Sequence, residues 1–391
     1  MKKLCLIFLA ALLAAWPITA RAYEYENEYE EEYIRPLYYA GAVTILCAQT
    51  GELLYAYRPH QRFYAASLVK VMTALLVLEH VDNLNEVITL SETAAYLPWY
   101  AAHMGLVAGD QFTVLDGLYG NMLPSANEVA NALAEHVAGS IPAFVQMMNT
   151  RAAELGAYNT RFVNACGLPG YGQFTTAYDM SLIMREAIQH DIFVRLISAP
   201  HYNFPPMYNH PEGRLIRNTN HLIRPESEFF HPHVVGGKTG WIIAAQNTLT
   251  TYSRRQNQGL IITLLYTERR DDTFIDTVAL MDLGFYLRTY GAPETLPPPV
   301  PELPLLPLPP DAPHPGETDP HSNPYDYTTD GASTGTSDFI GTLPTRNDYA
   351  ASGDSFFSNS PAYTVHLILA VVFSLFVGTV CAIALFPTKK K

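Results

Sequence analysis

Three short motifs that lie far apart in the chain constrain its fold more than any other feature. They are Ser67-Leu68-Val69-Lys70, Ser125-Ala126-Asn127 and Lys238-Thr239-Gly240. Each motif alone is a weak signal, because a Ser-x-x-Lys occurs by chance in many proteins of this size. Their order and their domain-scale separation predict a fold that brings a serine nucleophile, two lysines and an asparagine to one cleft.

The spacing of Ser67 and Lys70 predicts a nucleophile and its base. If Ser67 lies in the first turn of a helix, Lys70 lies one turn further on the same face, where the two side chains meet. A lysine can take the serine proton only where burial or a second cation lowers its pKa, and Lys238 is the predicted second cation. The apolar residues 71–78 predict a helix buried in the centre of a domain.

The other two motifs are predicted at the start of a helix and on a strand. Ser125 follows Pro124 in a turn, and a helix is expected to begin near Asn127. An ordinary helix N-cap is the alternative interpretation of this motif. Lys238 and Thr239 lie in an apolar strand with glycines on both sides, which suits the binding of a carboxylate. An ordinary edge-strand lysine is the alternative there.

These residues resemble those of the low-molecular-mass penicillin-binding proteins, the serine D-alanyl-D-alanine carboxypeptidases of peptidase family S11. The resemblance covers about Tyr38 to Tyr290 and extends beyond the three motifs. The further matching segments are Thr50 to Tyr55, Ala65 to Ala74, Phe162 to Leu168, Thr175 to Met180 and Asn218 to Leu222.

The resemblance assigns catalytic roles to Ser67, Lys70 and Ser125. Ser67 attacks the carbonyl and becomes the acyl-enzyme, and Lys70 is the base for that step. Ser125 passes a proton to the leaving D-alanine nitrogen. The implied activity is that of a serine hydrolase that removes the terminal D-alanine from peptidoglycan stem peptides and that is acylated by penicillins and other β-lactam antibiotics.

The resemblance assigns substrate binding to Asn127, Lys238, Thr239 and Trp241. Asn127 orients Lys70 and a substrate amide, and Lys238 and Thr239 hold the terminal carboxylate. The backbone N–H groups of Ser67 and Trp241 are expected to form an oxyanion hole.

Several residues near the site depart from the family pattern or have an open assignment. An arginine often helps to hold the carboxylate, and either Arg269 or Arg270 lies in the corresponding stretch. Cys166 stands where the family usually has a histidine, and Ile242 where a threonine is common. These departures concern the deacylation rate and the substrate preference.

Two other functions remain as alternatives. A class A-like β-lactamase uses the same three motifs but needs a Glu-x-x-Leu-Asn loop to activate water. The nearest glutamate, Glu154, has the wrong spacing. A penicillin-binding or sensor module that is acylated but turns over slowly is the second alternative.

The resemblance implies an α/β (α+β) fold of the β-lactamase/transpeptidase type, in which an antiparallel sheet flanked by helices lies beside a mostly helical lobe. Strands are expected near 41–58 and from about 232 to 267, followed by a helix from Asp272 to Tyr290. The helical lobe is expected from about Leu90 to Phe174, with the helix that starts at Ser67 between the lobes. Support from the residues alone comes from the apolar run 260–265 and from the helical spacing of Phe274, Val278, Met281 and Phe285.

Composition limits the kinds of partner that the protein is expected to bind. The net charge of −13 and the pI of about 5.4 make nucleic acid an unexpected partner. The histidines between His201 and His233 fit no zinc template, so neither a metal nor a cofactor is expected. Cys47, on a predicted strand, is expected to be a buried thiol, and a disulfide with Cys166 is the alternative in an exported protein.

The ends of the chain predict an exported protein that the membrane holds by the C-terminus. Residues 1–22 have the basic start, apolar run and small residues of a cleaved signal peptide, and an uncleaved anchor is the alternative. Residues 363–387 form an apolar stretch of membrane-spanning length, and the basic tail 388–391 is expected on the cytoplasmic side. The catalytic domain is therefore expected on the extracytoplasmic side of the cell membrane, in a single-pass protein.

Three segments are predicted between these ends. Residues 23–37 form an acidic, tyrosine-rich arm, and residues 38–290 form the carboxypeptidase-like domain. Residues 291–362 form a linker that is first proline-rich and then, by composition, disordered.

Overall fold

Five antiparallel strands form the main sheet of the computed structural model, which describes residues 38–207 and 209–291. In sheet order the strands are β2 (Leu53–Tyr57), β1 (Ala40–Cys47), β9 (Gln258–Thr267), β8 (Gln246–Arg255) and β7 (Val234–Ile242). Every residue of β1 is buried. This strand therefore reads as a continuous apolar run rather than an alternating one, as expected where both faces of a sheet are covered.

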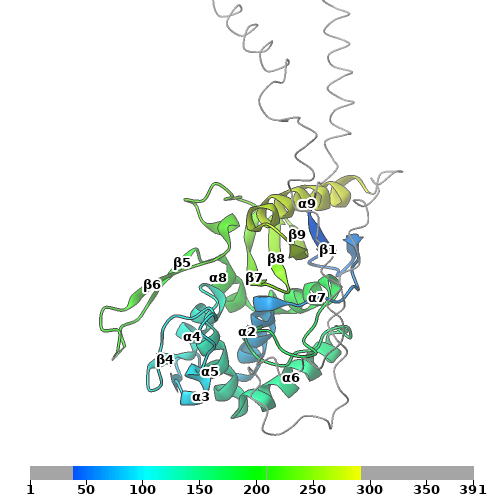
Figure 1. The fold of residues 1–391 in the computed structure, drawn as a ribbon. Helices are drawn as coiled ribbons and strands as arrows, with labels where there is room; N and C mark the ends of the chain where they lie inside the picture. Colours follow the sequence, from blue (N-terminus) through cyan, green and yellow to red (C-terminus); the bar gives the residue numbers. More distant parts are fainter. Residues whose placement is uncertain (1–37, 208, 292–391) are drawn as a thin grey trace, which may run out of the picture. The chain divides into compact units, whose positions relative to one another are not determined.

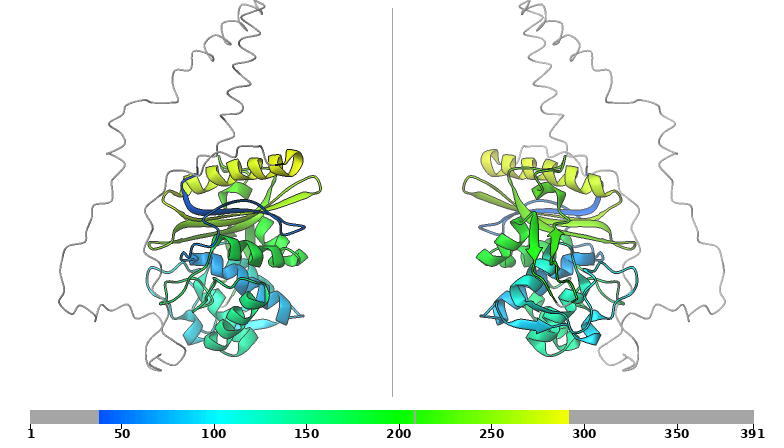
Figure 2. Two further views of the ribbon diagram at one scale, coloured as in Figure 1. Left: turned by 90° about the vertical axis from the view of Figure 1, so that its right-hand side faces the viewer. Right: turned by 90° about the vertical axis from the view of Figure 1, so that its left-hand side faces the viewer.

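Helices cover the sheet on both faces. Helix α9 (Arg270–Tyr290) packs against β9, β8 and β1, and α7 (Ala177–Ala187) packs against β9 and β1. Figure 2 shows α9, in yellow, on one face and the helical lobe on the other. The strand β7 forms one edge of the sheet and ends beside the helical lobe, so residues at its end can reach the junction between the two lobes (Figure 1).

Helix α2 (Val69–His80) runs through the centre of the helical lobe. Its first nine residues are buried, and it contacts α7 together with α4 (Val114–Met122), α5 (Asn127–Ala138) and α6 (Ile141–Glu154). Because neighbours surround it, α2 needs no polar face, which explains why most of its residues are apolar.

The remaining elements are short. They are β3 (Val87–Thr89) paired with β4 (Gln111–Thr113), α3 (Glu92–Ala95), α8 (Asp191–Ser198), β5 (His201–Phe204) paired with β6 (Arg214–Arg217), and the 3₁₀ turns η1 (Ala66–Leu68) and η2 (His221–Ile223). The β5–β6 hairpin reaches away from the other elements in Figure 1.

Side-chain caps fix where four helices begin. Thr113 and Asp116 form a reciprocal capping box at the start of α4, with both N–H···O distances at 3.1 Å. Such caps satisfy backbone N–H groups that have no partner within the helix. The other capping residues, each of which accepts from a backbone N–H three residues later, are Ser91 for α3, Ser140 for α6 and Thr176 for α7.

The predicted fold class is confirmed. The strands expected near 41–58 are β1 and β2, and those expected between 232 and 267 are β7, β8 and β9. The helix expected from Asp272 begins two residues earlier, at Arg270. The helix expected to start at Ser67 begins instead with η1, and the paired strands β3 and β4 were not expected.

The predicted terminal segments lie outside the described residues. This holds for the signal peptide 1–22, the acidic arm 23–37, the linker beyond Gly291, the membrane helix 363–387 and the tail 388–391. Within residues 38–207 and 209–291, no helix has both the length and the apolar character needed to cross a membrane.

Candidate active site

Ser67 lies in the strained turn η1, at the N-terminal end of α2. The residue before it, Ala66, has a φ of 48°, a left-handed conformation that L-residues seldom adopt. Ser67 lines a cleft with a volume of about 600 Å³. Backbone strain of this kind collects at functional sites, where the surrounding structure holds it in place.

Two glycines let neighbouring backbone pack directly against this turn. A Cβ atom on Gly167, whose φ is +86°, would lie 2.0 Å from the carbonyl oxygen of Ala66. A Cβ atom on Gly240 would lie 3.0 Å from the backbone nitrogen of Ser67. The loop before α7 and the strand β7 therefore enclose the nucleophile turn from two sides.

Lys70 has three oxygen atoms around its amine. Its Nζ donates to Oδ1 of Asn127 and to the carbonyl oxygen of Cys166, both at 2.5 Å, and lies 3.3 Å from Oγ of Ser67. The two short contacts can use both hydrogens of a neutral amine. The lone pair then faces the serine hydroxyl, which is the arrangement that a general base requires.

The position of Lys70 favours this neutral form. The side chain is fully buried, and burial lowers its pKa from 10.5 to about 8. The nearby carboxyl of Glu128 opposes this shift. Lys70 can therefore lose its proton at a pH far below that of an exposed lysine.

Lys238 is the second buried lysine of the cleft. Its Nζ donates to the carbonyl oxygen of Thr239 at 2.9 Å. Burial and the charge of Lys70 place the pKa of Lys238 well below its usual value. The repulsion between the two lysines supports the prediction that Lys238 is a second cation close to Lys70.

Ser125 and Asn127 reach the cleft from the start of α5. Ser125 lines the cleft with a φ of 66°, and its buried Oγ has no hydrogen-bond partner within the described part of the chain. A buried hydroxyl without a partner is costly unless a ligand satisfies it. Asn127 is the first residue of α5, as expected, and its Oδ1 accepts from Lys70.

The far end of the cleft contains hydroxyl groups and an arginine. Oγ1 of Thr239 lies 2.6 Å from Oγ1 of Thr219, and both residues line the cleft with Arg270. Arg269 instead pairs with Asp272 at 3.8 Å. The structure therefore assigns Arg270, rather than Arg269, to the cleft.

Two tryptophans have exposed side chains, and one of them lines the cleft. Trp241, on β7, lines it and has a side chain that is 61% exposed. Trp99 is 92% exposed and lies three residues before Ala102, another lining residue. The backbone of Trp241 follows directly on Gly240 beside Ser67, so the backbone N–H groups of Ser67 and Trp241 belong to adjacent segments.

Sequence reasoning missed two groups that support the site. The carbonyl of Cys166 is held in place because Oδ1 of Asn164 accepts from the backbone N–H groups of Cys166 and Gly167. The buried carboxylate of Glu128 accepts from the backbone N–H of Met104 at 2.6 Å, which fixes the loop that carries Ala102. Glu128 leaves a sequence signal, a charged residue beside Asn127 in an apolar helix, whereas a backbone carbonyl leaves none.

The two cysteines among the described residues form no disulfide with each other. Cys47, at the end of β1, and Cys166, in the loop before α7, are both buried thiols that are not joined to each other. The expectation of a buried thiol at position 47 is confirmed, and the alternative of a disulfide is wrong. Nowhere in residues 38–207 and 209–291 do three potential metal-ligating His, Cys, Asp or Glu side chains gather.

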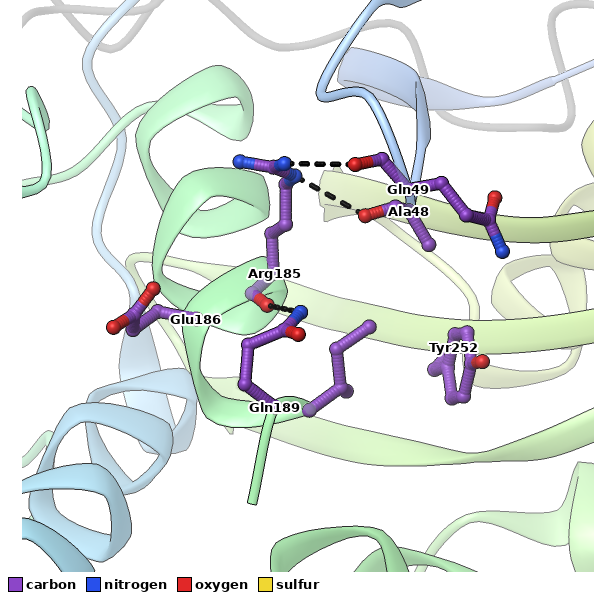
Figure 3. Close-up of a pocket in the computed structure, with 7 residues that line it drawn as sticks. Ala48, Gln49, Arg185, Glu186, Gln189 and Tyr252 are labelled. Atoms are coloured by element: carbon purple, nitrogen blue, oxygen red, sulfur yellow. Dashed lines mark hydrogen bonds between the residues drawn. The ribbon is translucent and has the colours of Figure 1, made fainter. Parts of the chain in front are cut away.

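A second pocket, of about 270 Å³, lies away from the three motifs. It is formed by α7, β8 and the turn after β1 (Figure 3). Arg185 already donates to the carbonyl oxygens of Ala48 and Gln49, and Glu186 pairs with Arg151 at 2.8 Å. Both charged side chains of this pocket therefore already have partners within the protein. Its lining contains no nucleophile–base pair.

Comparison with known proteins shows which family the chain resembles. The family described as Peptidase S11, D-alanyl-D-alanine carboxypeptidase, matches residues 31–268, which is more than half of the chain. The D-alanyl-D-alanine carboxypeptidase DacF of Bacillus subtilis is 29% identical over 250 residues, which cover 63% of this chain and 62% of that protein. The chain therefore spans less than two thirds of this relative.

Two further similarities cover more of the related protein. The D-alanyl-D-alanine carboxypeptidase DacB2 of Mycobacterium tuberculosis is 32% identical over 228 residues, which cover 57% of this chain and 74% of that protein. The crystal structure of the Streptomyces K15 DD-transpeptidase has a TM-score of 0.58 and 27% identity. That comparison covers 64% of this chain and 99% of the K15 chain.

Proposed function

Since the chain belongs to the Peptidase S11 family of D-alanyl-D-alanine carboxypeptidases, we propose that it is a serine hydrolase that removes the terminal D-alanine from peptidoglycan stem peptides. The observation that carries the proposal is the amine of Lys70, held by Asn127 and Cys166 with Ser67 at 3.3 Å. This arrangement supplies an activated serine in a cleft that also contains carboxylate-binding groups.

Acylation begins when Lys70 takes the hydroxyl proton of Ser67. The serine oxygen then forms a bond to the carbonyl carbon of the penultimate D-alanine. The backbone N–H groups of Ser67 and Trp241 would stabilise the oxyanion that develops. When the carbon–nitrogen bond breaks, Ser125 gives its proton to the amine of the departing D-alanine and takes the proton that Lys70 holds, so Lys70 is neutral again.

Hydrolysis of the acyl-enzyme completes the cycle. A water molecule enters where D-alanine has left and loses a proton to Lys70 as its oxygen bonds to the acyl carbon. The bond to Ser67 then breaks, and the serine oxygen takes the proton back from Lys70. Lys70 thus acts twice, and its pKa near 8 suits both directions of transfer.

The substrate carboxylate is bound at the far end of the cleft. Thr239 and Arg270 line this region, and Lys238 lies beneath it as a buried amine. A terminal carboxylate would give the buried ammonium of Lys238 a counter-ion. Penicillins also have a carboxylate beside their reactive carbonyl, so the same groups support acylation by β-lactam antibiotics.

The position of Glu154 does not favour a class A-like β-lactamase. Glu154 lies at the end of α6, is largely exposed and pairs with Arg151 at 3.2 Å. It is absent from the residues that line the cleft. A water-activating carboxylate of that class would have to lie within hydrogen-bond reach of the attacking water.

Release of D-alanine tests the proposed function. The soluble domain is incubated with a peptide that ends in D-alanyl-D-alanine, and free D-alanine is followed by mass spectrometry. We expect release by the wild type and none by Ser67→Ala. A labelled penicillin should be attached to the peptide that contains Ser67, and labelling that persists in Ser67→Ala would rule out this nucleophile.

We also propose that the protein acts outside the cytoplasm, attached to the membrane by its C-terminus. Support comes from the sequence of residues 1–22, which resembles a signal peptide, and from the apolar stretch 363–387 with its basic tail 388–391. This location would place the cleft on the side where peptidoglycan is assembled.

A further inference from the structure

We propose that His221 is a positioning residue that holds Arg270 in the cleft through an unprotonated ring nitrogen, so that protonation of His221 weakens carboxylate binding. This inference rests on the proposed function and deepens it, since it concerns how the same site binds the carboxylate.

Arg270 is held at the cleft by two acceptors. Its Nη2 donates to Nε2 of His221 at 3.1 Å and to the carbonyl oxygen of Thr219 at 3.3 Å. Arg270 and Thr219 both line the cleft, beside Thr239. A guanidinium has five N–H donors in a rigid fork, so anchoring one nitrogen fixes the direction of the remaining donors.

The ring of His221 can act only as an acceptor at this nitrogen. Nη1 of Arg224 lies 3.2 Å from the same Nε2, so two guanidinium groups donate to it. Nε2 must therefore carry no proton, and the neutral ring has its hydrogen on Nδ1. The ring also stacks on Phe274, with centroids 5.3 Å apart and planes within 6°.

The charges around His221 favour the neutral ring. Arg270 and Asp271 face it from α9, and Arg224 and Glu226 face it from its own segment. Burial and the two arginines lower its pKa below 6.5, and the two carboxylates only partly oppose them. Protonation would remove the acceptor and place a third positive charge between two guanidinium groups.

A matched pair of variants separates this role from simple packing. His221→Phe keeps an aromatic ring on Phe274 but removes the acceptor. His221→Gln keeps an acceptor near the position of Nε2 but cannot titrate. A third variant, Arg270→Ala, removes the group that His221 positions.

The measurement is the KM and kcat of D-alanine release between about pH 5 and about pH 8. The wild-type KM should rise as the pH falls below 6.5, and the KM of His221→Gln should stay flat over that range. His221→Phe should raise KM about tenfold near pH 8, where His221 of the wild type is neutral, with kcat changed less than about twofold. His221→Phe added to Arg270→Ala should cause no further rise.

Two results would overturn the proposal. One is a KM in His221→Phe equal to that of the wild type. The other is a KM in His221→Gln that follows the wild-type pH dependence, which would assign that dependence to another group. A peptide with an amidated C-terminus serves as control, because its binding should not respond to His221.

Failure of the proposed function would be seen separately. If the wild type releases no D-alanine, the acylation rate constant for benzylpenicillin, which has a carboxylate, replaces KM as the readout in the same variants. The three variants are then expected to keep their order, with His221→Gln near the wild type and His221→Phe near Arg270→Ala. Equal rate constants in all of them would overturn the role of His221.

Discussion

At the scale of single residues, the chemistry of the site depends on two buried lysines that have no anionic partner. Among the residues that the structure describes, neither Lys70 nor Lys238 forms an ion pair, and each is essentially buried. Two such amines cannot both be charged at low cost. A substrate carboxylate beside Lys238 would raise its pKa. We therefore expect substrate binding to favour a charged Lys238 and a neutral Lys70.

The pH dependence of acylation tests the state of Lys70. Because its pKa is lowered to about 8, the neutral fraction grows as the pH rises through that value. The acylation rate constant for penicillin should therefore increase with pH, with its midpoint near 8. Stopped-flow acylation of the wild type measures it. A rate constant that falls over this interval would show that the charged lysine is the active form.

Substitution of each lysine by arginine distinguishes a lysine that acts as a base from one that acts only as a positive charge. A guanidinium keeps its proton in the accessible pH range, so Lys70→Arg should lose acylation by a factor of about 10²–10⁴. Lys238→Arg keeps the charge with altered geometry, so it should retain measurable acylation. The two rate constants are compared from mildly acidic to strongly basic pH. If they are nearly equal, Lys70 is not the base, and Ser125 with Lys238 becomes the leading alternative.

The sequence predicts the catalytic side chains better than the groups that hold them in position. Residues of all three motifs line the cleft, and Lys70 and Asn127 lie behind Ser67 in one hydrogen-bonded group, because motif spacing depends on the chemistry of the side chains. The carbonyl of Cys166 could not be predicted, since any residue type supplies a carbonyl. Nor could Arg270 be separated from Arg269, because neighbouring helix residues point about 100° apart and the choice depends on one residue of register.

At the scale of elements, the nucleophile turn depends on what packs against it. The turn η1 keeps its strained Ala66 because the loop at Gly167 and the strand β7 at Gly240 contact it through backbone atoms. Sequence reasoning expected a helix from Ser67 itself. The helix α2 begins only at Val69, because those tertiary contacts override local helix preference.

Alanine at Gly167 should disrupt this turn. Its Cβ would lie 2.0 Å from the carbonyl oxygen of Ala66, so the turn or the loop must move. We expect a loss of stability of more than about 2 kcal/mol and a large loss of penicillin acylation. Gly139→Ala is the control, since its φ of +75° imposes the same backbone strain but nothing lies within 4 Å. That control should lose about 1 kcal/mol and keep its acylation rate.

Denaturant unfolding and acylation kinetics measure both variants. If Gly167→Ala acylates as fast as Gly139→Ala, contact with the loop does not hold the nucleophile in place.

The short strands β3 and β4 show a different limit of sequence reasoning. Each has three residues and pairs with a segment far along the chain, so neither has enough alternation to be recognised.

At the scale of the whole molecule, the proposed location makes a prediction about access. If residues 363–387 anchor the chain and the catalytic domain lies outside, protease added to intact cells or protoplasts should cut within residues 311–360 and release the domain. Immunoblotting of the supernatant detects a fragment that still binds labelled penicillin. A domain that stays protected until the membrane is permeabilised would contradict the proposed orientation.

The exposure of the tryptophans affects the intrinsic fluorescence of the protein. The chain has three tryptophans, and Trp16 lies in the predicted signal peptide, so the mature protein would keep only Trp99 and Trp241. Both are largely exposed, which places their emission maximum close to that of an unfolded chain, and Trp241 lines the cleft. Intrinsic fluorescence should therefore report poorly on unfolding and well on the arrival of a ligand. Trp99→Phe would leave a single emitter next to the acylated serine, and quenching of its emission would follow acylation in real time.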